Sequence, residues 1–278
     1  MARLKYYFIL IRPLNVLIGR LSIFIGALIA GTISPLLKVI FACISGGLVA
    51  GAANVINDFY DIEIDKVNKP YRPLAANKIT PKEALYYSMI LYVIGIIFGW
   101  IVNWQAFLVS LLCSLLLYWY SAKLKRTVLW GNLTVSLVTA MAFIYGGIAV
   151  NRLSYAIIPA VFSFVYHLGR EIIKDAEDIE GDKADDIITF PIKYGKIPAL
   201  RLATLIYLFL IVITIVPYWL SIFGIYYLIF VLGIVDLTVV FVLFSMWKNN
   251  EAKQLSRLSL LLKLNMFAGL IAIYLGKF

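Results

Sequence analysis

Charged residues and cysteines are both scarce in this 278-residue sequence, and each shortage excludes a class of protein. Only 14% of the residues are charged and 63% are hydrophobic, whereas about a quarter of the residues of a soluble domain carry charge. The two cysteines, Cys43 and Cys113, both lie inside apolar runs, so we expect no disulfide, zinc site or redox pair. The mean hydropathy of +0.92 indicates a polytopic α-helical membrane protein.

The apolar runs are continuous, and the short alternating segments of a membrane β-barrel are missing. The first run is followed by no small-residue cleavage site, so we interpret it as a retained helix and not as a signal peptide. We predict an all-α bundle of nine transmembrane helices in a single domain, residues 1–278. The predicted helices cover residues 13–31, 36–57, 82–102, 105–122, 130–150, 153–174, 198–217, 219–247 and 257–276.

Basic residues are concentrated in alternate loops. All but four of the 25 lysines and arginines fall on one side of the predicted membrane. The positive-inside rule therefore places the N-terminus and these loops in the cytoplasm and the C-terminus outside, as in a multi-pass plasma-membrane protein. We attribute the net charge of +10 to these loops and to anionic lipid headgroups, and expect no nucleic-acid partner.

Acidic residues are concentrated at the ends of two apolar segments. The first cluster has the sequence NVINDFYDIEID and covers residues 54–65. On a helix, five oxygen-bearing side chains of this stretch share an arc of about 100°. A face that presents only oxygen ligands suits a hard divalent cation. The five residues are Asn54, Asn57, Asp58, Asp61 and Asp65.

A second cluster repeats the spacing of the first. Asp175, Asp178 and Asp182 are separated by three and then four residues, as are Asp58, Asp61 and Asp65. We predict two related halves whose acidic helix ends face each other across a central cavity. Because Mg²⁺ prefers one or two carboxylates together with substrate phosphates, acids surrounded by lysine and arginine indicate a Mg²⁺–diphosphate site. The alternative is solvated loop acids that pair with nearby lysines. The remaining acids of the second cluster are Glu171, Glu177, Glu180, Asp185 and Asp186.

Several stretches resemble the motifs of one family. NDFYDIEID followed by NKPYRPL, and KDAEDIEGD followed by TFPIKYG, are similar to the two aspartate-rich motifs of the UbiA family of intramembrane prenyltransferases. YSAKLKR followed by Gly131-Asn132 resembles a further family pattern, and the resemblance runs from RPLN at Arg12 to the last helix. It implies a nine-helix bundle with a lipid-open cavity that transfers a polyprenyl group from its diphosphate to an acceptor, using Mg²⁺.

The resemblance also implies roles for individual residues. The metal ligands would be Asn57, Asp61 and Asp65 for one Mg²⁺, and Asp178 and Asp182 with support from Asp175 for the other. Asp58 belongs to the metal motif, with a supporting place beside the ligands as the alternative. Asp61, Asp65, Asp178, Asp182 and Tyr120 would carry the catalysis. Substrate contacts are expected from Arg20, Arg72, Tyr120, Ser121, Lys125, Arg126 and Asn132.

Three of these substrate contacts have a simpler alternative. Arg20 would otherwise be a residue that extends to the membrane surface, Tyr120 an interfacial aromatic residue and Asn132 a helix cap. Lys123 is equally well explained as an interfacial lysine. We interpret His167 as a polar residue packed between helices, with a general base as the alternative, and Asp236 as a structural residue.

The acceptor is the least constrained part of the prediction. The compact spacing in DKVNKPYRP resembles the archaeal family members that make ether lipids and also the chlorophyll synthase-like members. This favours geranylgeranyl transfer to the hydroxyl of geranylgeranylglyceryl phosphate, a lipid-phosphate acceptor, with no obligatory protein partner. An aromatic or chlorophyll-like acceptor is the alternative within the family. Outside it, a divalent-cation transporter would have its acids near the bilayer midplane, and the pattern of a CDP-alcohol phosphotransferase is missing.

Overall fold

The structure of the chain, a computed structural model, describes residues 2–184 and 187–277. Every regular element within these ranges is a helix, so the predicted all-α class is confirmed for the described part of the chain. Asp185 and Asp186 of the second acidic cluster lie outside the described residues.

The helices form two compact units. The first comprises Met1–Lys125 and Met141–Ser154, and the second comprises Arg126–Ala140 and Tyr155–Phe278. Helix α7 (Trp130–Ala149) contributes its first half to the second unit and its second half to the first. The other elements of the first unit are α1 (Ala2–Leu10), α2 (Pro13–Ile29), α3 (Leu36–Tyr60), α4 (Ile62–Asn68), α5 (Pro81–Val102) and α6 (Trp104–Ala122).

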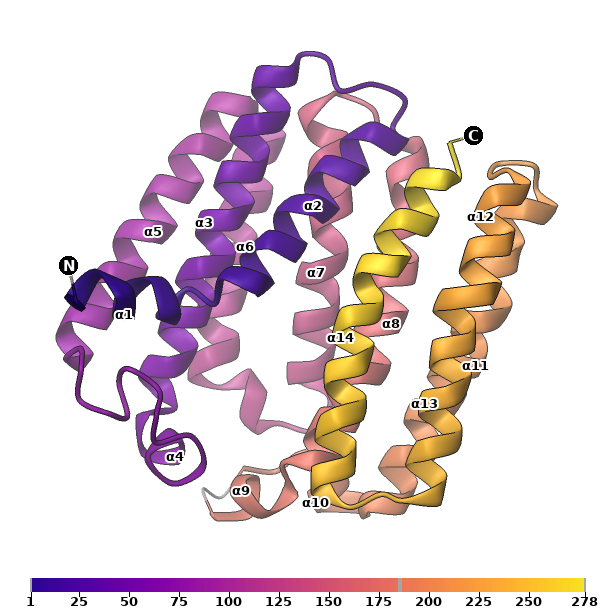
Figure 1. Cartoon of the computed structure of the whole chain (residues 1–278). Helices are drawn as coiled ribbons and strands as arrows, with labels where there is room; N and C mark the ends of the chain where they lie inside the picture. The colour runs from indigo at the N-terminus through magenta and orange to yellow at the C-terminus, as the bar shows by residue number, and fades with distance from the viewer. Residues whose placement is uncertain (1, 185–186, 278) are drawn as a thin grey trace. The chain divides into compact units, whose positions relative to one another are not determined.

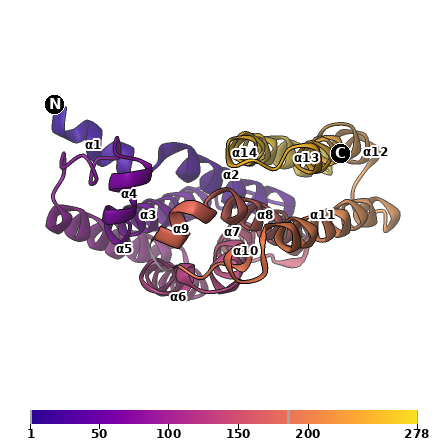
Figure 2. The same cartoon turned by 90° about the horizontal axis from the view of Figure 1, so that it is seen from below.

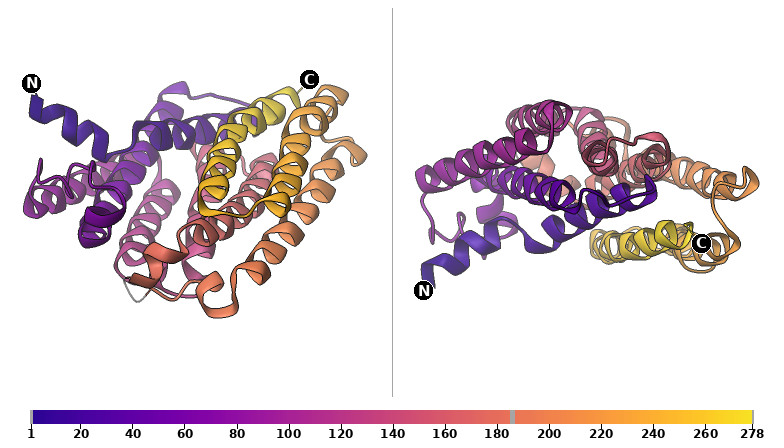
Figure 3. Two further views of the ribbon diagram at one scale, coloured as in Figure 1. Left: turned by 60° about the horizontal axis from the view of Figure 1, so that its bottom comes forward. Right: turned by 90° about the horizontal axis from the view of Figure 1, so that it is seen from above.

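Helix α3 forms the centre of the first unit. It packs along α5 and also contacts α2 and α6 (Figure 1; Figure 3). Ser45 on α3 is completely buried; its hydroxyl donates to the Gly95 carbonyl oxygen at 2.7 Å and lies 2.7 Å from the Tyr145 hydroxyl. Because a buried hydroxyl is costly without hydrogen bonds, this pair of contacts stabilises the packing of α3 against its neighbours.

The first predicted helix, residues 13–31, corresponds to α2, and a short helix that was not predicted, α1, precedes it. The structure has two helices, α1 and α2, with an angle of 49° between them and a break at Ile11 and Arg12. Arg12 has a φ of 52°, a left-handed conformation that is uncommon for residues other than glycine. Pro13 follows as the first residue of α2, where its missing N–H has no helical partner to lose.

Helix α8 is central to the second unit. It packs against α11 and α14, and α13 lies beside α14 (Figure 2). A buried aliphatic cluster that includes Ile172, Leu200 and Leu262 joins α8, α11 and α14. The elements that complete the chain are η1 (Leu124–Arg126), η2 (Ser154–Ala156), α8 (Ile157–Glu177), α9 (Ile179–Ala184), α10 (Phe190–Tyr194), α11 (Lys196–Trp219), α12 (Ile225–Phe230), η3 (Val231–Asp236), α13 (Leu237–Lys248) and α14 (Ala252–Leu275).

Asp236 and His167, which we interpret from the sequence as structural residues, both lie in the second unit. Asp236 ends the π-helical segment η3 and accepts a hydrogen bond from the Thr214 hydroxyl of α11 at 3.0 Å. Thr214 is fixed in turn, because its carbonyl oxygen accepts a hydrogen bond from Tyr227 at 2.7 Å. His167 lies on α8, and no described residue forms a hydrogen bond with its buried Nδ1.

The count of membrane spans differs from the prediction. Within the described residues, seven helical stretches are long and apolar enough to cross a membrane, or eight if the bent pair α1 and α2 is one span. The nine predicted segments are all largely helical, but α8 is not among the candidate spans because charged residues crowd its last two turns. The composition of the chain therefore supports a multi-pass membrane protein with at least seven spans by this criterion.

Candidate functional site

The first acidic cluster lies at a break between two helices. Helix α3 ends at Tyr60, Asp61 has a φ of −101° and a ψ of 11°, and α4 begins at Ile62. Helical hydrogen bonds continue on both sides of the break, since Asp61 N donates to Asn57 O at 3.0 Å and Asp65 N to Asp61 O at 2.8 Å. The expectation of one continuous helix over residues 54–65 was wrong in this detail, because the backbone turns at the middle aspartate.

The second acidic cluster has the same local backbone. Helix α8 ends at Glu177, Asp178 has a φ of −90° and a ψ of 8°, and α9 begins at Ile179. Asp178 N donates to Lys174 O at 3.0 Å and Asp182 N donates to Asp178 O at 2.9 Å. The repeat seen in the sequence is therefore also a repeat of local structure: a long helix, a break at the middle aspartate and a short helix that carries the last one.

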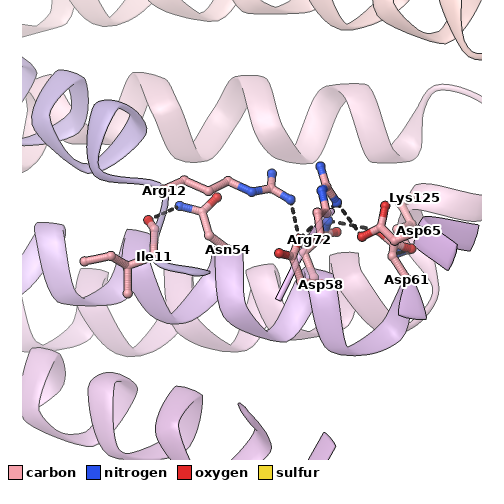
Figure 4. A network of polar contacts seen from close by, with 9 residues as sticks. Ile11, Arg12, Asn54, Asp58, Asp61, Asp65, Arg72 and Lys125 are labelled. Carbon is pink, nitrogen blue, oxygen red and sulfur yellow. Dashed lines mark hydrogen bonds and ion pairs between the residues drawn. The ribbon is translucent and has the colours of Figure 1, made fainter. Parts of the chain in front are cut away.

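Each carboxylate of the first cluster contacts a cation (Figure 4). Asp61 pairs with Lys125, which follows α6. Asp65 accepts a hydrogen bond from Arg72 Nη1 at 2.6 Å, and the same nitrogen lies 3.1 Å from Asp58 Oδ1. Asp58 Oδ1 also accepts a hydrogen bond from Arg12. Three carboxylates thus share three cations, all within the first unit.

Arg72 is positioned by the loop that follows α4. Its backbone N–H donates to Lys69 O at 2.9 Å, its carbonyl oxygen accepts from Ala76 N at 2.8 Å, and its side chain is only 19% exposed. Burial alone would lower the pKa of Arg72, but the carboxylates of Asp58 and Asp65 raise it above its ordinary value. Arg72 is therefore a permanent cation beside the acidic cluster.

Burial also changes the pKa of Asp65, the carboxylic acid that Arg72 contacts. Asp65 is 4% exposed, and its burial raises its pKa even though the Arg72 hydrogen bond acts to lower it. A carboxylate that has lost its water needs another source of positive charge. Arg72 supplies part of that charge, and a divalent cation bound at this site would add to it.

Asn57 offers the clearest fit to a metal. Its Nδ2 donates to Asp61 Oδ2 at 2.9 Å, while its Oδ1 is buried and accepts no hydrogen bond from any described residue. A buried amide oxygen without a partner, on a side chain that also contacts a carboxylate, is a suitable ligand for Mg²⁺. Across the described residues, no three histidine, cysteine, aspartate or glutamate side chains are close enough together to hold a metal. In the first cluster, the carboxylates are directed to Arg12, Arg72 and Lys125.

The aspartates of the second cluster have a different set of partners. Asp175 accepts a hydrogen bond from Asn132 Nδ2 at 2.7 Å, so Asn132 holds this carboxylate from the first turn of α7. Asp178 lies 3.7 Å from Lys174 Nζ. Thr189 is 3.5 Å from Asp182, at the limit of a hydrogen bond. Asn132 thus contacts a predicted metal-site acid, which the sequence did not indicate.

The remaining predicted contacts have varied surroundings. Ser121 is buried and donates to its own helix at Leu117 O, 3.1 Å away, while Tyr120 beside it is half-buried. Arg126 and Lys123 are exposed. Arg20 is also exposed, and its guanidinium lies against α3 at Gly47, where a Cβ would approach Cζ to 3.0 Å. Their contact with a substrate stays a prediction.

Arg12 is the residue of this site that the sequence analysis did not select. The sequence marked it only as one of many basic residues on the cytoplasmic side. Its ion pair joins residues 46 positions apart, so no local pattern could have indicated it. The one available signal was its place in RPLN, immediately before the proline that begins α2.

Comparison with known proteins gives a consistent answer. The model of the UbiA prenyltransferase family matches residues 21–269. A protein of Methanococcus maripaludis named digeranylgeranylglyceryl phosphate synthase is 38% identical over 276 residues, which is 99% of this chain and 98% of that protein. A protein of the same name from Methanosphaera stadtmanae is 34% identical over 97% of this chain and 98% of its own length.

Solved structures agree with the sequence comparison. One from a study of digeranylgeranylglyceryl phosphate synthase in membranes has a TM-score of 0.80 and 36% identity, covering 99% of both chains. A UbiA homologue from Archaeoglobus fulgidus bound to GPP and Mg²⁺ has a TM-score of 0.73 and 19% identity, covering 97% of this chain and 99% of its own, and shares the fold. Two acidic helix breaks of matching geometry, a match over most of the length and relatives above 30% identity agree: the chain belongs to the UbiA prenyltransferase family and is a prenyltransferase.

Proposed function

We propose that this prenyltransferase transfers a geranylgeranyl group from geranylgeranyl diphosphate to the free hydroxyl of geranylgeranylglyceryl phosphate. The reaction forms the second ether bond of an archaeal membrane lipid. The observation that carries the proposal is the set of oxygen ligands and cations at the first helix break, which suits a metal-bound diphosphate. The names of the near-full-length relatives support the lipid-phosphate acceptor.

Magnesium is the proposed cofactor. Asn57, Asp61 and Asp65 would hold one ion, and Asp178 and Asp182, with Asp175 in support, would hold another. When bound, Mg²⁺ would neutralise charge on the diphosphate as the allylic C–O bond breaks. The orphaned Asn57 oxygen supports this assignment from the chain itself.

The protein's own residues would orient the substrate and stabilise the leaving group. Arg72 and Lys125 would bind diphosphate oxygens, because charge-assisted hydrogen bonds to phosphate are stronger than neutral ones. The hydroxyl oxygen of the acceptor forms a bond to the allylic carbon, diphosphate departs and the hydroxyl proton is released. Arg20 would lie beside the diphosphate, and Tyr120 beside the allylic cation. The cavity that holds the cation must exclude water, which would otherwise react with it.

The proposal includes a finer architecture than the helices alone establish. Nine membrane spans, with α8 as a charged span, would form one domain from the two units. Their acidic ends would face each other around a central cavity at the cytoplasmic side, with the N-terminus inside and the C-terminus outside. The matching backbone of Asp61 and Asp178 supports the relation between the two halves.

The test is prenyl transfer with radiolabelled geranylgeranyl diphosphate and Mg²⁺. Asp61→Asn and Asp178→Asn are expected to lose most activity, whereas the matched surface variants Glu63→Gln and Glu180→Gln keep it, since both glutamates are exposed. Full activity in both aspartate variants would contradict the metal assignment. Product with 4-hydroxybenzoate, and none with geranylgeranylglyceryl phosphate, would replace the lipid acceptor by an aromatic one.

A further inference from the structure

Asp58 differs from the other carboxylates of its cluster in its partners. It is 3% exposed, and its Oδ1 accepts hydrogen bonds from two guanidinium groups, Arg12 and Arg72. Asp61 and Asp65 each contact a single cation in the described structure, Lys125 and Arg72 respectively. Asp61 also accepts a hydrogen bond from the amide nitrogen of Asn57. Two arginines on one oxygen leave that oxygen little capacity for a metal, because Mg²⁺ and a guanidinium compete for the same lone pairs.

The position of Arg12 is fixed by the backbone. Asn54 Nδ2 donates to the Ile11 carbonyl oxygen at 2.9 Å (Figure 4). Leu10, one residue earlier, is completely buried in a cluster with Val55 of α3. The left-handed conformation of Arg12 then directs its side chain to Asp58, one helical turn beyond Asn54. A strained backbone at an irregular joint is typical of residues with a functional role.

Charge explains why Asp58 is needed. Arg12 and Arg72 carry like charges and would repel each other at the distance at which both contact one oxygen. A carboxylate between them removes this repulsion and keeps both guanidiniums on one side of the cluster. A diphosphate has several anionic oxygens, and a pair of fixed guanidiniums is a strong receptor for it.

We propose that Asp58 is a positioning residue, not a metal ligand: it joins Arg12 and Arg72 into one pair of guanidiniums that binds the diphosphate of the prenyl substrate. This inference rests on the proposed function, since it takes a prenyl diphosphate as the substrate. It adds Arg12 to the diphosphate-binding residues and connects the break between α1 and α2 to the site.

The first experiment measures metal and diphosphate separately, with the purified full-length protein in detergent. Mn²⁺ binding is followed by electron paramagnetic resonance, and inorganic diphosphate binding by calorimetry at saturating Mg²⁺. The double variant Arg12→Gln/Asp58→Asn removes one charge of each sign, so the net charge of the cluster does not change. We expect its diphosphate Kd to rise about tenfold, as for the loss of one hydrogen bond between charged groups, and its Mn²⁺ Kd to stay within about threefold of wild type.

Control variants separate this role from general damage. Arg3→Ala removes an exposed arginine of the same N-terminal region, and Glu63→Gln an exposed acid of the same motif; both keep wild-type affinities. Asp61→Asn is expected to lose Mn²⁺ binding. Arg12→Lys keeps the charge and is expected to restore part of the diphosphate affinity that Arg12→Gln loses.

The outcomes are distinct. A Mn²⁺ Kd that rises tenfold or more in the double variant, as in Asp61→Asn, would make Asp58 a metal ligand and overturn the inference. So would additive effects of Arg12→Gln and Asp58→Asn on diphosphate binding, because residues that act through one contact are not additive. If the wild-type protein binds no diphosphate with Mg²⁺, the proposed function itself fails; wild-type binding that the double variant retains unchanged overturns only the role of Asp58.

Discussion

Helix α2 and the second half of α7 approach each other through two glycines, and substitution of Gly146 is expected to separate them. A Cβ at Gly146 would lie 2.7 Å from the Ala27 nitrogen and closer still to the Ile23 carbonyl oxygen. At Gly26, a Cβ would lie 2.8 Å from the Phe143 Cα. These neighbours are backbone atoms that cannot rotate away, so Gly146→Ala must move a whole helix.

The size of the effect follows from two opposing terms. Overpacking of a well-packed interior costs typically 1–3 kcal/mol and occasionally more, and a backbone clash belongs to the upper part of this range, about 3 kcal/mol. Replacement of a helical glycine by alanine returns about 1 kcal/mol through helix propensity. The net loss is about 2 kcal/mol, which lowers Tm by about 4–8 °C for a chain of this size.

The assay is thermal unfolding of the purified protein in detergent, followed by intrinsic fluorescence. Gly269→Ala on α14 is the matched control, because nothing lies within 4 Å of the position that its Cβ would occupy. The control is expected to keep or raise Tm, since only the propensity term applies. If Gly146→Ala is as stable as Gly269→Ala, the two helices are not in backbone contact at this point and the reasoning is refuted.

Three further predictions address the site and its surroundings. Gly47→Ala is expected to push the flexible Arg20 guanidinium away from α3, raising the KM for prenyl diphosphate about tenfold with little change in Tm; an unchanged KM would remove Arg20 from the substrate contacts. Thr80 caps α5 through reciprocal hydrogen bonds with Glu83, so Thr80→Ala should lower Tm by about 2–4 °C while Lys78→Ala does not, as measured by thermal unfolding. Chelation with EDTA is expected to abolish prenyl transfer and added Mg²⁺ to restore it, and activity that persists in the chelator would exclude an essential divalent cation.

The helices were predictable because hydropathy and charge are local properties of the sequence. The segments predicted at 36–57 and 82–102 correspond to α3 at Leu36–Tyr60 and α5 at Pro81–Val102. The bend between α1 and α2 was not predicted, because it depends on contacts of Ile11 and Arg12 with α3. The predicted nine spans are not confirmed by length and composition, since α8 is both a core helix and the carrier of a charged cluster.

The candidate site was predictable in composition but not in its contacts. The spacing of the aspartates identified both clusters, and the structure shows that each spacing contains a helix break. Residues on either side of Asp61 and Asp178 are all compatible with a helix, so nothing in the sequence marked the breaks. Arg12 and Asn132 contact Asp58 and Asp175 over 46 and 43 positions, and such pairings arise only when helices pack.

The charge balance of the first cluster bears on how the site distinguishes its substrate. Asp58, Asp61 and Asp65 are matched by Arg12, Arg72 and Lys125, so these side chains together carry no net charge. A neutral set of side chains attracts a diphosphate only weakly, whereas the same set with a divalent cation is positive and attracts it strongly. Affinity for the substrate would then depend on the metal, and the cations already in place would need only to exchange carboxylate oxygens for diphosphate oxygens. If the proposed metal and arginine pair both bind the substrate, this arrangement would favour prenyl diphosphates over the many singly charged lipid phosphates of a membrane, because a diphosphate could engage the metal and the paired arginines together.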